Sequence, residues 1–421
     1  MKKKLITLLL WSQKYTKADM LYLAKGGFWV SFGQGLNSLL SMVLIIAFAN
    51  LLPKETYGLY RYVLSISGIL TIFTLTGMNN AVSRTVALGE PGILRPAINY
   101  QLKWNLLMLV ALYGTGGYYL LHGEYDFATA FFILGTFVPA TLAFNTYGAY
   151  LLGLKKFQAV NILSILSTLI YTIGMLITAF FSQDFLWLVA IYTLTTFLAS
   201  VMFYLYTLRT YHPPHTTDET AISDTLAYGR KLTYIKLLGP VTSQIDKVIL
   251  GHFWGPVQLA TYSLATTIPS KAIPALKNLI DIGFPKFATK TPAQINTVFY
   301  MRIMQGLGIG AVVTIMYSGI APYLFKYLLP QYIDGVFYSQ ILAISFIFAL
   351  PTRYIGLLFE SQKLSRLVFT NNSINGILLI ILYIGFGFWG GVLGLVIAQV
   401  VHSFLGFMVN LVSWRMYTRH K

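Results

Sequence analysis

Ionisable side chains inside long apolar segments are the residues of this sequence that could do chemistry. Lys271 stands about a dozen residues from either end of an apolar segment predicted over residues 257–283. Helical periodicity places Thr267, Lys271, Pro274 and Asn278 on one face of that segment. A charge in the middle of a membrane costs on the order of several kcal/mol unless it faces a cavity or a partner. We therefore expect Lys271 to bind substrate in a polar cavity that Thr267 and Asn278 also line; the alternative is an ion pair with a neighbouring helix.

The preceding apolar segment carries a second set of polar residues. Lys236 and Lys247 lie on one helical face, with Gln244 on its flank. Each lysine lies within two turns of a segment end, so each either faces the cavity or extends to the membrane surface. Asp246 points away from Lys247 around the helix. It is either a coupling group that exchanges a proton or sodium ion, or the salt-bridge partner of Lys271.

Arg61 opens the second apolar segment and adds a fourth candidate cation to the cavity. The sequence holds no phosphate-binding P-loop and no cluster of histidines and carboxylates with metal-ligand spacing. Cysteine is absent, which excludes thiolate metal sites and a cysteine nucleophile. We therefore expect a protein that is not an enzyme and that uses no cofactor or metal beyond a proton or sodium gradient.

These residues need a membrane-embedded scaffold to position them. Of the 421 residues, 56% are hydrophobic and only 10% are charged, and the mean hydropathy is +0.66. Soluble domains carry about 25% charged residues, so the composition predicts an all-α, polytopic membrane protein. Apolar segments long enough to be candidate spans recur twelve times. They cover residues 27–49, 59–81, 104–121, 127–152, 158–181, 185–208, 228–252, 257–283, 303–321, 336–358, 367–386 and 390–413.

The distribution of positive charge predicts the orientation. The net charge is +17, and 22 of the 30 Lys and Arg residues fall in segments on one side of the predicted membrane, against three on the other side. Cytoplasmic loops are enriched in Lys and Arg, so we expect both termini in the cytoplasm. The same pattern explains the charge excess without a nucleic-acid partner.

The two halves resemble each other at an offset of 202 residues. In both, a helix end and a short turn lead into a new helix that carries an aromatic residue, with Tyr60 matching Tyr262. Six spans per half, entering in the same direction, predict two lobes related as a parallel repeat around a central cavity. The predicted organisation is a basic cytoplasmic arm, an N-terminal lobe, a cytoplasmic linker, a C-terminal lobe and a cytoplasmic tail, at residues 1–26, 27–208, 209–227, 228–413 and 414–421.

Three stretches resemble a known transporter family. They are residues 51–60 (LLPKETYGLY), residues 244–251 (QIDKVILG) followed by 262–265 (YSLA), and residues 321–332 (APYLFKYLLPQY). With the helix count and spacing, they make the chain similar to the Wzx-type oligosaccharide flippases of the multidrug/oligosaccharidyl-lipid/polysaccharide (MOP) exporter superfamily, in the O-antigen, capsule or exopolysaccharide branch.

The resemblance implies a function. It implies a flippase that moves an undecaprenyl-pyrophosphate-linked oligosaccharide to the outer leaflet of the inner membrane by alternating access. The expected partners are that lipid-linked substrate, membrane lipids, and a polysaccharide polymerase with its chain-length machinery. The alternatives are an ion-coupled drug or metabolite exporter of the same superfamily and a membrane polysaccharide polymerase or ligase. The short loops disfavour the last, because such enzymes generally carry a large external loop.

Overall fold

The structure is a computed structural model that describes residues 20–214, 218–281 and 292–419. The described residues are almost entirely helical, and they divide into two compact units. Most of the predicted N-terminal arm, residues 1–26, lies outside the described residues, as do the last two residues of the predicted tail. The rest of that tail continues the last helix as far as Arg419.

Unit 1 comprises residues 1–47, 73–182 and 186–236. It contains most of α2 (Met20–Leu51) together with α4 (Met78–Ala87), α5 (Leu94–Trp104), α6 (Leu106–Leu121), α7 (Tyr125–Phe144), α8 (Thr146–Gly153), α9 (Phe157–Phe181), α10 (Phe185–Tyr211) and α11 (Glu219–Ile235). Its apolar core gathers around buried side chains of α4, α5 and α8, including Met78, Ile98 and Tyr150.

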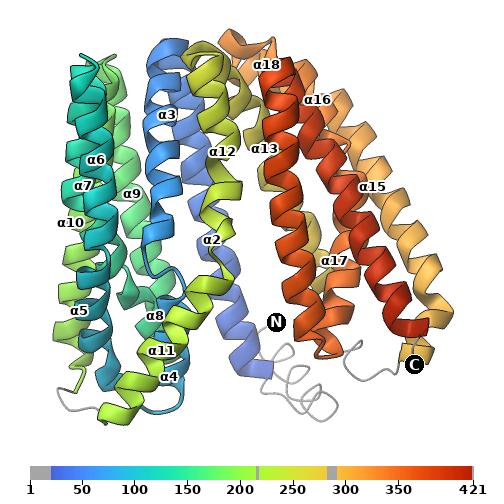
Figure 1. The fold of residues 1–421 in the computed structure, drawn as a ribbon, viewed down its shortest axis with the longest axis horizontal. Helices are drawn as coiled ribbons and strands as arrows, with labels where there is room; N and C mark the ends of the chain where they lie inside the picture. The colour runs from blue at the N-terminus through green and yellow to red at the C-terminus, as the bar shows by residue number, and fades with distance from the viewer. Residues whose placement is uncertain (1–19, 215–217, 282–291, 420–421) are drawn as a thin grey trace, which may run out of the picture. The chain divides into compact units, whose positions relative to one another are not determined.

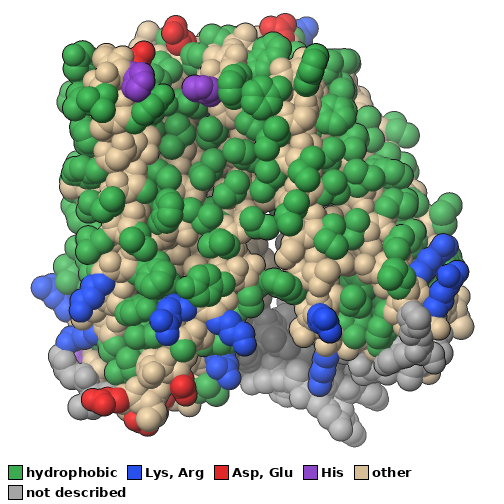
Figure 2. Space-filling model, viewed as in Figure 1, with side chains coloured by type: hydrophobic (Ala, Val, Ile, Leu, Met, Phe, Trp, Pro, Cys, Tyr) green, Lys and Arg blue, Asp and Glu red, His purple; other side chains and the backbone are tan. Residues whose placement is uncertain are grey.

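Unit 2 comprises residues 48–72, 183–185 and 237–421. It contains α3 (Lys54–Leu70), α12 (Leu238–Phe253), α13 (Pro256–Asp281), α15 (Pro292–Leu328), α16 (Gly335–Ala343), α17 (Phe346–Ser361) and α18 (Ser365–Arg419). One of its cores packs Phe299, Phe359 and Trp414 from three different helices. In each unit, Lys and Arg side chains gather toward one end, next to a broad apolar surface (Figure 2).

Within the described residues, each of the twelve predicted segments falls largely on helix. Seven helices of this part of the chain are long and apolar enough to cross a membrane, and the pair of residues 54–73 and α4 would be an eighth if it is one broken span. The prediction of an all-α, multi-pass membrane protein is confirmed. Several predicted spans are interrupted, and the last two are joined in α18 at Gly391, whose φ of 51° and ψ of −127° are not helical. Trp254 packs against Gly391, where a side chain would clash.

Two of these interruptions have a visible cause. The predicted segment 59–81 stops being regular after Leu70, and the chain resumes as α4 at Met78. The predicted segment 228–252 is split at Lys236 and Leu237 into α11 and α12. Here α11 packs on α4 instead of continuing into α12, and the Gly77 amide donates a hydrogen bond to the Thr233 hydroxyl over 3.0 Å. The packing of α11 against α4 within unit 1 therefore separates α11 from α12, although both lie in one predicted span.

The matched junctions of the sequence repeat have the same local structure. The helix α2 ends at Leu51 and α3 begins at Lys54, while α12 ends at Phe253 and α13 begins at Pro256. The two helix ends are 202 residues apart, and so are the two helix starts, which is the predicted offset. Tyr60 and Tyr262, the aromatic residues matched in the sequence, are both buried.

The units do not coincide with the lobes expected from chain order. The helix α3 precedes the predicted linker, yet it runs beside α12 and α13 in unit 2 (Figure 1). Gly58 makes this approach close, because a Cβ atom there would collide with the carbonyl oxygen of Pro256. Conversely, α11 packs in unit 1 although the predicted second lobe begins within it, at residue 228. Arg61 is thereby brought into unit 2.

A candidate polar cavity in unit 2

Unit 2 contains a partly open cavity of about 380 Å³ that is lined mostly by polar residue types. This volume lies in the range of small-molecule binding sites, roughly 300–1,000 Å³. Five helices contribute to it, together with Ser345 between α16 and α17. The lining residues are Arg61 from α3; Thr242, Ser243, Asp246 and Lys247 from α12; Ser263, Thr266, Thr267, Ser270 and Ile273 from α13; Leu342 and Ser345; and Leu379, Tyr383, Gln399, His402 and Ser403 from α18.

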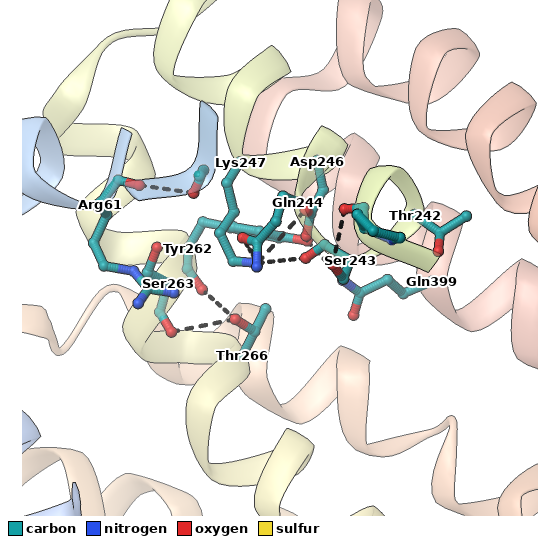
Figure 3. A network of polar contacts seen from close by, with 12 residues as sticks. Arg61, Thr242, Ser243, Gln244, Asp246, Lys247, Tyr262, Ser263, Thr266 and Gln399 are labelled. Atoms are coloured by element: carbon teal, nitrogen blue, oxygen red, sulfur yellow. Dashed lines mark hydrogen bonds and ion pairs between the residues drawn. The ribbon is translucent and has the colours of Figure 1, made fainter. Parts of the chain in front are cut away.

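An ion pair between sequence neighbours lies in the wall of this cavity. The Lys247 ammonium is 3.7 Å from Oδ1 of Asp246, and both side chains are largely buried. The same ammonium donates to the Ser243 carbonyl over 2.9 Å and to Oε1 of Gln244 over 3.1 Å, as the sticks in Figure 3 show. The long lysine stem therefore folds back along its own helix, which brings together two charges that the helix directs to different sides.

The other oxygen of Asp246 begins a chain of buried hydrogen bonds between helices. The Tyr262 hydroxyl on α13 donates to Oδ2 of Asp246 over 2.6 Å. That hydroxyl oxygen in turn accepts a hydrogen bond from Nε2 of Gln399 on α18, also over 2.6 Å. Tyr262 is fully buried and Asp246 is 5% exposed. The Tyr262 hydroxyl thus links the Asp246 carboxylate of α12 to Gln399 of α18, so the chain of hydrogen bonds joins three helices.

Two donors that line the cavity have hydrogen-bonding capacity to spare. Nε of Arg61 and the hydroxyl of Ser263 are buried and have no hydrogen-bond partner among the described residues. A buried donor without an acceptor costs about 1–3 kcal/mol, so such atoms mark places where a ligand is stabilised. Arg61 and Lys247 are both cationic, and they line the same cavity (Figure 3). Phosphate and carboxylate groups match these donors.

The hydroxyl-rich wall of α13 follows from its sequence. Ser263, Thr266, Thr267 and Ser270 recur at helical spacing, so they share the face toward the cavity. Thr266, Thr267 and Ser270 also donate to backbone carbonyls three or four residues earlier, as with Thr267 to Ser263 over 2.6 Å. Their oxygens stay available as acceptors, which suits hydroxyl-bearing ligands such as sugars. The helix continues through Pro269 and Pro274.

The structure brings together half of the residues predicted from the sequence. Lys247, Arg61, Asp246 and Thr267 line the cavity. Gln244 does not line it but accepts a hydrogen bond from Lys247. The rest are placed as follows. Lys271 is exposed and is not among the lining residues, Lys236 is exposed at the break after α11, and the side chain of Asn278 lies outside the described residues.

A salt bridge between Asp246 and Lys271 was one of the two alternatives for this carboxylate, and the structure shows a different partner. Among the described residues, the ion pair of Asp246 is with Lys247. The sequence argument used the angle between neighbouring positions on a helix and neglected the reach of the lysine side chain. Sequence reasoning also missed Gln399 and Tyr383. The only available signal was a polar group within an apolar segment, and each of the two segments holds several polar groups of this kind, which usually serve packing.

Comparisons with known proteins agree with this architecture. Residues 23–276 match the family described as "Polysaccharide biosynthesis protein". The chain belongs to this family. No curated protein matches the chain significantly in sequence. The fold is that of transporters of the MOP superfamily, as solved structures show at low sequence identity.

Three solved structures illustrate the likeness. The lipid II flippase MurJ in an inward closed conformation matches with a TM-score of 0.67 at 12% identity, over 91% of this chain and 87% of that one. An outward-facing multidrug resistance MATE family transporter matches with a TM-score of 0.61 at 12% identity, over 94% and 95%. A MOP superfamily transporter from Pyrococcus furiosus, described as having a binding pocket of reverse polarity, matches with a TM-score of 0.57 at 14% identity, over 94% of this chain and 95% of that one.

Proposed function

We propose that this protein is a flippase that moves a lipid-linked oligosaccharide, carried on undecaprenyl pyrophosphate, across the bacterial inner membrane for cell-surface polysaccharide synthesis. The proposal rests above all on the unpartnered guanidinium Nε of Arg61, which lines a polar cavity together with Lys247. Membership of the polysaccharide biosynthesis family and the fold shared with a lipid II flippase support it. The Wzx-type, O-antigen-related branch is the one that the sequence resembles.

The chemistry of the cavity suits such a head group. A pyrophosphate offers several oxygens to the Arg61 and Lys247 donors, and charge-assisted hydrogen bonds of this kind are stronger than neutral ones. The hydroxyls of α13 and α18 can exchange hydrogen bonds with sugars. The polyprenyl tail remains in lipid. Alternating access then exposes the head group first to the cytoplasm and later to the periplasm.

Asp246 is the residue that we propose couples transport to a proton or sodium gradient. Its Oδ1 has only Lys247 as an ionic partner among the described residues, and its Oδ2 is held by Tyr262. An anion that draws the Lys247 ammonium away leaves the carboxylate without its counter-charge. A proton or sodium ion would then restore neutrality, because an unpaired buried charge is strongly disfavoured.

An ion-coupled exporter of drugs or metabolites is the second candidate. The structural match to a multidrug resistance MATE family transporter shows that this fold also occurs in an exporter. Organic cations favour a cavity rich in carboxylates, however, whereas Asp246 is the only acidic residue among the described residues that line this cavity. We do not propose a polymerase or ligase, since such enzymes generally carry a large external loop and the connections between the predicted spans are short. A polymerase and its chain-length machinery are instead proposed as the partners that use the exported glycan.

The decisive experiment measures lipid transfer in sealed liposomes. Purified protein is reconstituted with an undecaprenyl-pyrophosphate-linked oligosaccharide, and a glycosidase outside the vesicles reports how much sugar becomes accessible. Wild type should make the inner-leaflet pool accessible, and Arg61→Gln should slow the transfer about tenfold, the loss of one charge-assisted hydrogen bond. Lys326→Ala, an exposed cation of unit 2 outside the cavity, is the matched control and should leave the rate unchanged.

Two outcomes would reject the proposal. If wild type leaves the oligosaccharide in place under proton and sodium gradients in both directions, the exporter becomes the better candidate. If transfer occurs but Arg61→Gln is as fast as wild type, the cavity is not the binding site. Lys271→Ala tests the residue favoured by the sequence, and a large effect from it alone would place the site elsewhere on α13.

A further inference from the structure

A second cavity lies wholly within unit 1, where α9 begins and α10 ends (Figure 1). Its volume is about 310 Å³. Ile162 and Leu163 of α9 give it apolar walls, Tyr206 and Tyr211 of α10 give it two phenol groups, and Lys156 lines it from the residue before α9. This composition differs from the hydroxyl-rich cavity of unit 2 and resembles an interfacial lipid environment, apolar on one side and cationic on the other.

The one charged residue among the described residues that line this cavity is a lysine. Lys156 is exposed, as are its neighbour Lys155 and Arg209 near the end of α10. None of the described residues that line the cavity is acidic. The amide groups of the first turn of α9 add partial positive charge at the same place. The segment belongs to the side on which the Lys and Arg residues of the sequence are concentrated, where membrane leaflets carry anionic lipids.

Exposed apolar side chains continue from the cavity along both helices. On α9, Leu166, Ile173 and Ile177 follow Ile162 at helical spacing, and Ile173 and Ile177 are both more than half exposed. On α10, Met202 is one turn from Tyr206 and is 48% exposed. The helices pack together, since a Cβ on Gly174 of α9 would touch Thr195 of α10. The two rows can therefore guide acyl chains away from the cationic end.

We propose that this cavity binds the headgroup of one anionic phospholipid of the leaflet on the Lys- and Arg-rich side. The phosphate contacts Lys156, the glycerol region lies between the tyrosines, and the acyl chains follow the apolar rows of α9 and α10. Tyrosine and lysine at the membrane surface are suited to this depth, with their polar ends in the headgroup layer. The site is independent of the transported substrate, so its test does not depend on the proposed function.

The test measures binding of phosphatidylglycerol with a fluorescent acyl chain to full-length protein in detergent micelles, with labelled phosphatidylcholine as the neutral comparison. Wild type should bind phosphatidylglycerol more tightly. Lys156→Ala should weaken that binding about fivefold, the effect of one lysine at a membrane surface, and should leave phosphatidylcholine unchanged. Lys103→Ala removes another exposed lysine of unit 1 outside the cavity and should bind both lipids as wild type does.

A second variant separates the cavity from surface charge. Ala159→Phe fills the cavity and keeps every lysine, and it should weaken the binding of both lipids. A photoactivatable phosphatidylglycerol should crosslink to peptides from α9 and α10 in wild type and much less in Lys156→Ala. The proposal fails if Lys156→Ala binds phosphatidylglycerol like wild type, or if Lys103→Ala is equally impaired. It also fails if millimolar inorganic phosphate displaces the lipid, because the site would then recognise free phosphate.

Discussion

The two cavities of this protein handle charge in opposite ways. In unit 2, Arg61, Asp246 and Lys247 line the cavity within hydroxyl-rich walls. In unit 1, the four apolar segments over residues 104–208 contain no Asp, Glu, Lys or Arg within their predicted bounds, and the cation of the cavity precedes its helix. In unit 2 the largely buried Asp246 and Lys247 neutralise each other, whereas unit 1 keeps its cation at the exposed end of a helix. Unit 2 is suited to a polar ligand, and unit 1 to a lipid.

Breaking the ion pair of unit 2 should have the largest effect. Lys247→Ala leaves the Asp246 carboxylate buried without a counter-charge, and removing one partner of a buried pair costs about 3 kcal/mol or more. Thermal unfolding in detergent, followed by tryptophan fluorescence, should show a clearly lower midpoint. Lys54→Ala is the control, because Lys54 pairs with Asp334 at 4.0 Å and Asp334 is 78% exposed. It should cost under about 1 kcal/mol. Equal midpoints for the two variants would contradict the contrast between buried and exposed charge.

Separating α3 from α13 is expected to have the next largest effect. Gly58→Ala places a methyl group against the Pro256 carbonyl, so α3 must shift, at about 1–3 kcal/mol. Gly114→Ala in α6 is the matched control. No atom lies near its Cβ position, and alanine favours helices over glycine, so this variant should be neutral or slightly stabilised. The same thermal measurement checks both, and a stable Gly58→Ala would show that α3 packs less closely than described.

Tyr262→Phe should have a smaller effect. It removes the hydroxyl that joins Asp246 to Gln399, and it leaves the buried carboxylate and the half-buried amide each with one fewer partner. The expected cost is about 1–2 kcal/mol. The variant should also alter the ion dependence of transport more than Tyr60→Phe, which changes the matched tyrosine of α3. If the two tyrosine variants behave alike, the polar network of unit 2 has no special role.

The smallest effect concerns the start of α11 in unit 1. The side-chain hydroxyl and backbone amide of Thr220 both donate to Asp218, and they hold the pKa of that carboxyl below its usual value. A lowered pKa contributes stability above the unfolded value near 3.8, and this stability disappears as the pH falls through the folded pKa. Asp218→Asn should therefore differ slightly from wild type at pH 7 and converge with it in acid. A difference that grows below pH 4 would contradict the assignment.

Much of the fold follows from the sequence, because lipid exposure forces long apolar helices. Within the described residues the twelve predicted segments fall largely on helix, and the junctions before α3 and α13 begin 202 residues apart. The breaks within predicted spans were not predicted. Lys236 and the nearby Pro240 interrupt the apolar pattern, but the break at Lys236 also depends on the packing of α11 against α4, which involves residues far apart in sequence. The placement of α3 in unit 2 was not predicted for the same reason, because it depends on contacts with α12 and α13, which are distant in sequence.

The candidate site was predictable only in part. Arg61, Asp246 and Lys247 were identified because charge in an apolar segment is conspicuous. Lys271 satisfied the same criterion, yet the structure leaves it exposed outside the cavity. Periodicity gives the face of a residue on its own helix, but not which other helices stand opposite. Gln399 illustrates the converse, since only its bond to Tyr262 shows its importance.

The position of α3 has a consequence for how the chain can be divided. A cut between α10 and α11 separates the two halves of the sequence, but α3 belongs to the first fragment and packs against α12 and α13 of the second. The fragments would remain associated through this helix, and also through α11, which belongs to the second fragment and packs on α4 of the first. Two separately expressed halves should therefore associate in the membrane, and a first half that lacks α3 should bind its complement more weakly.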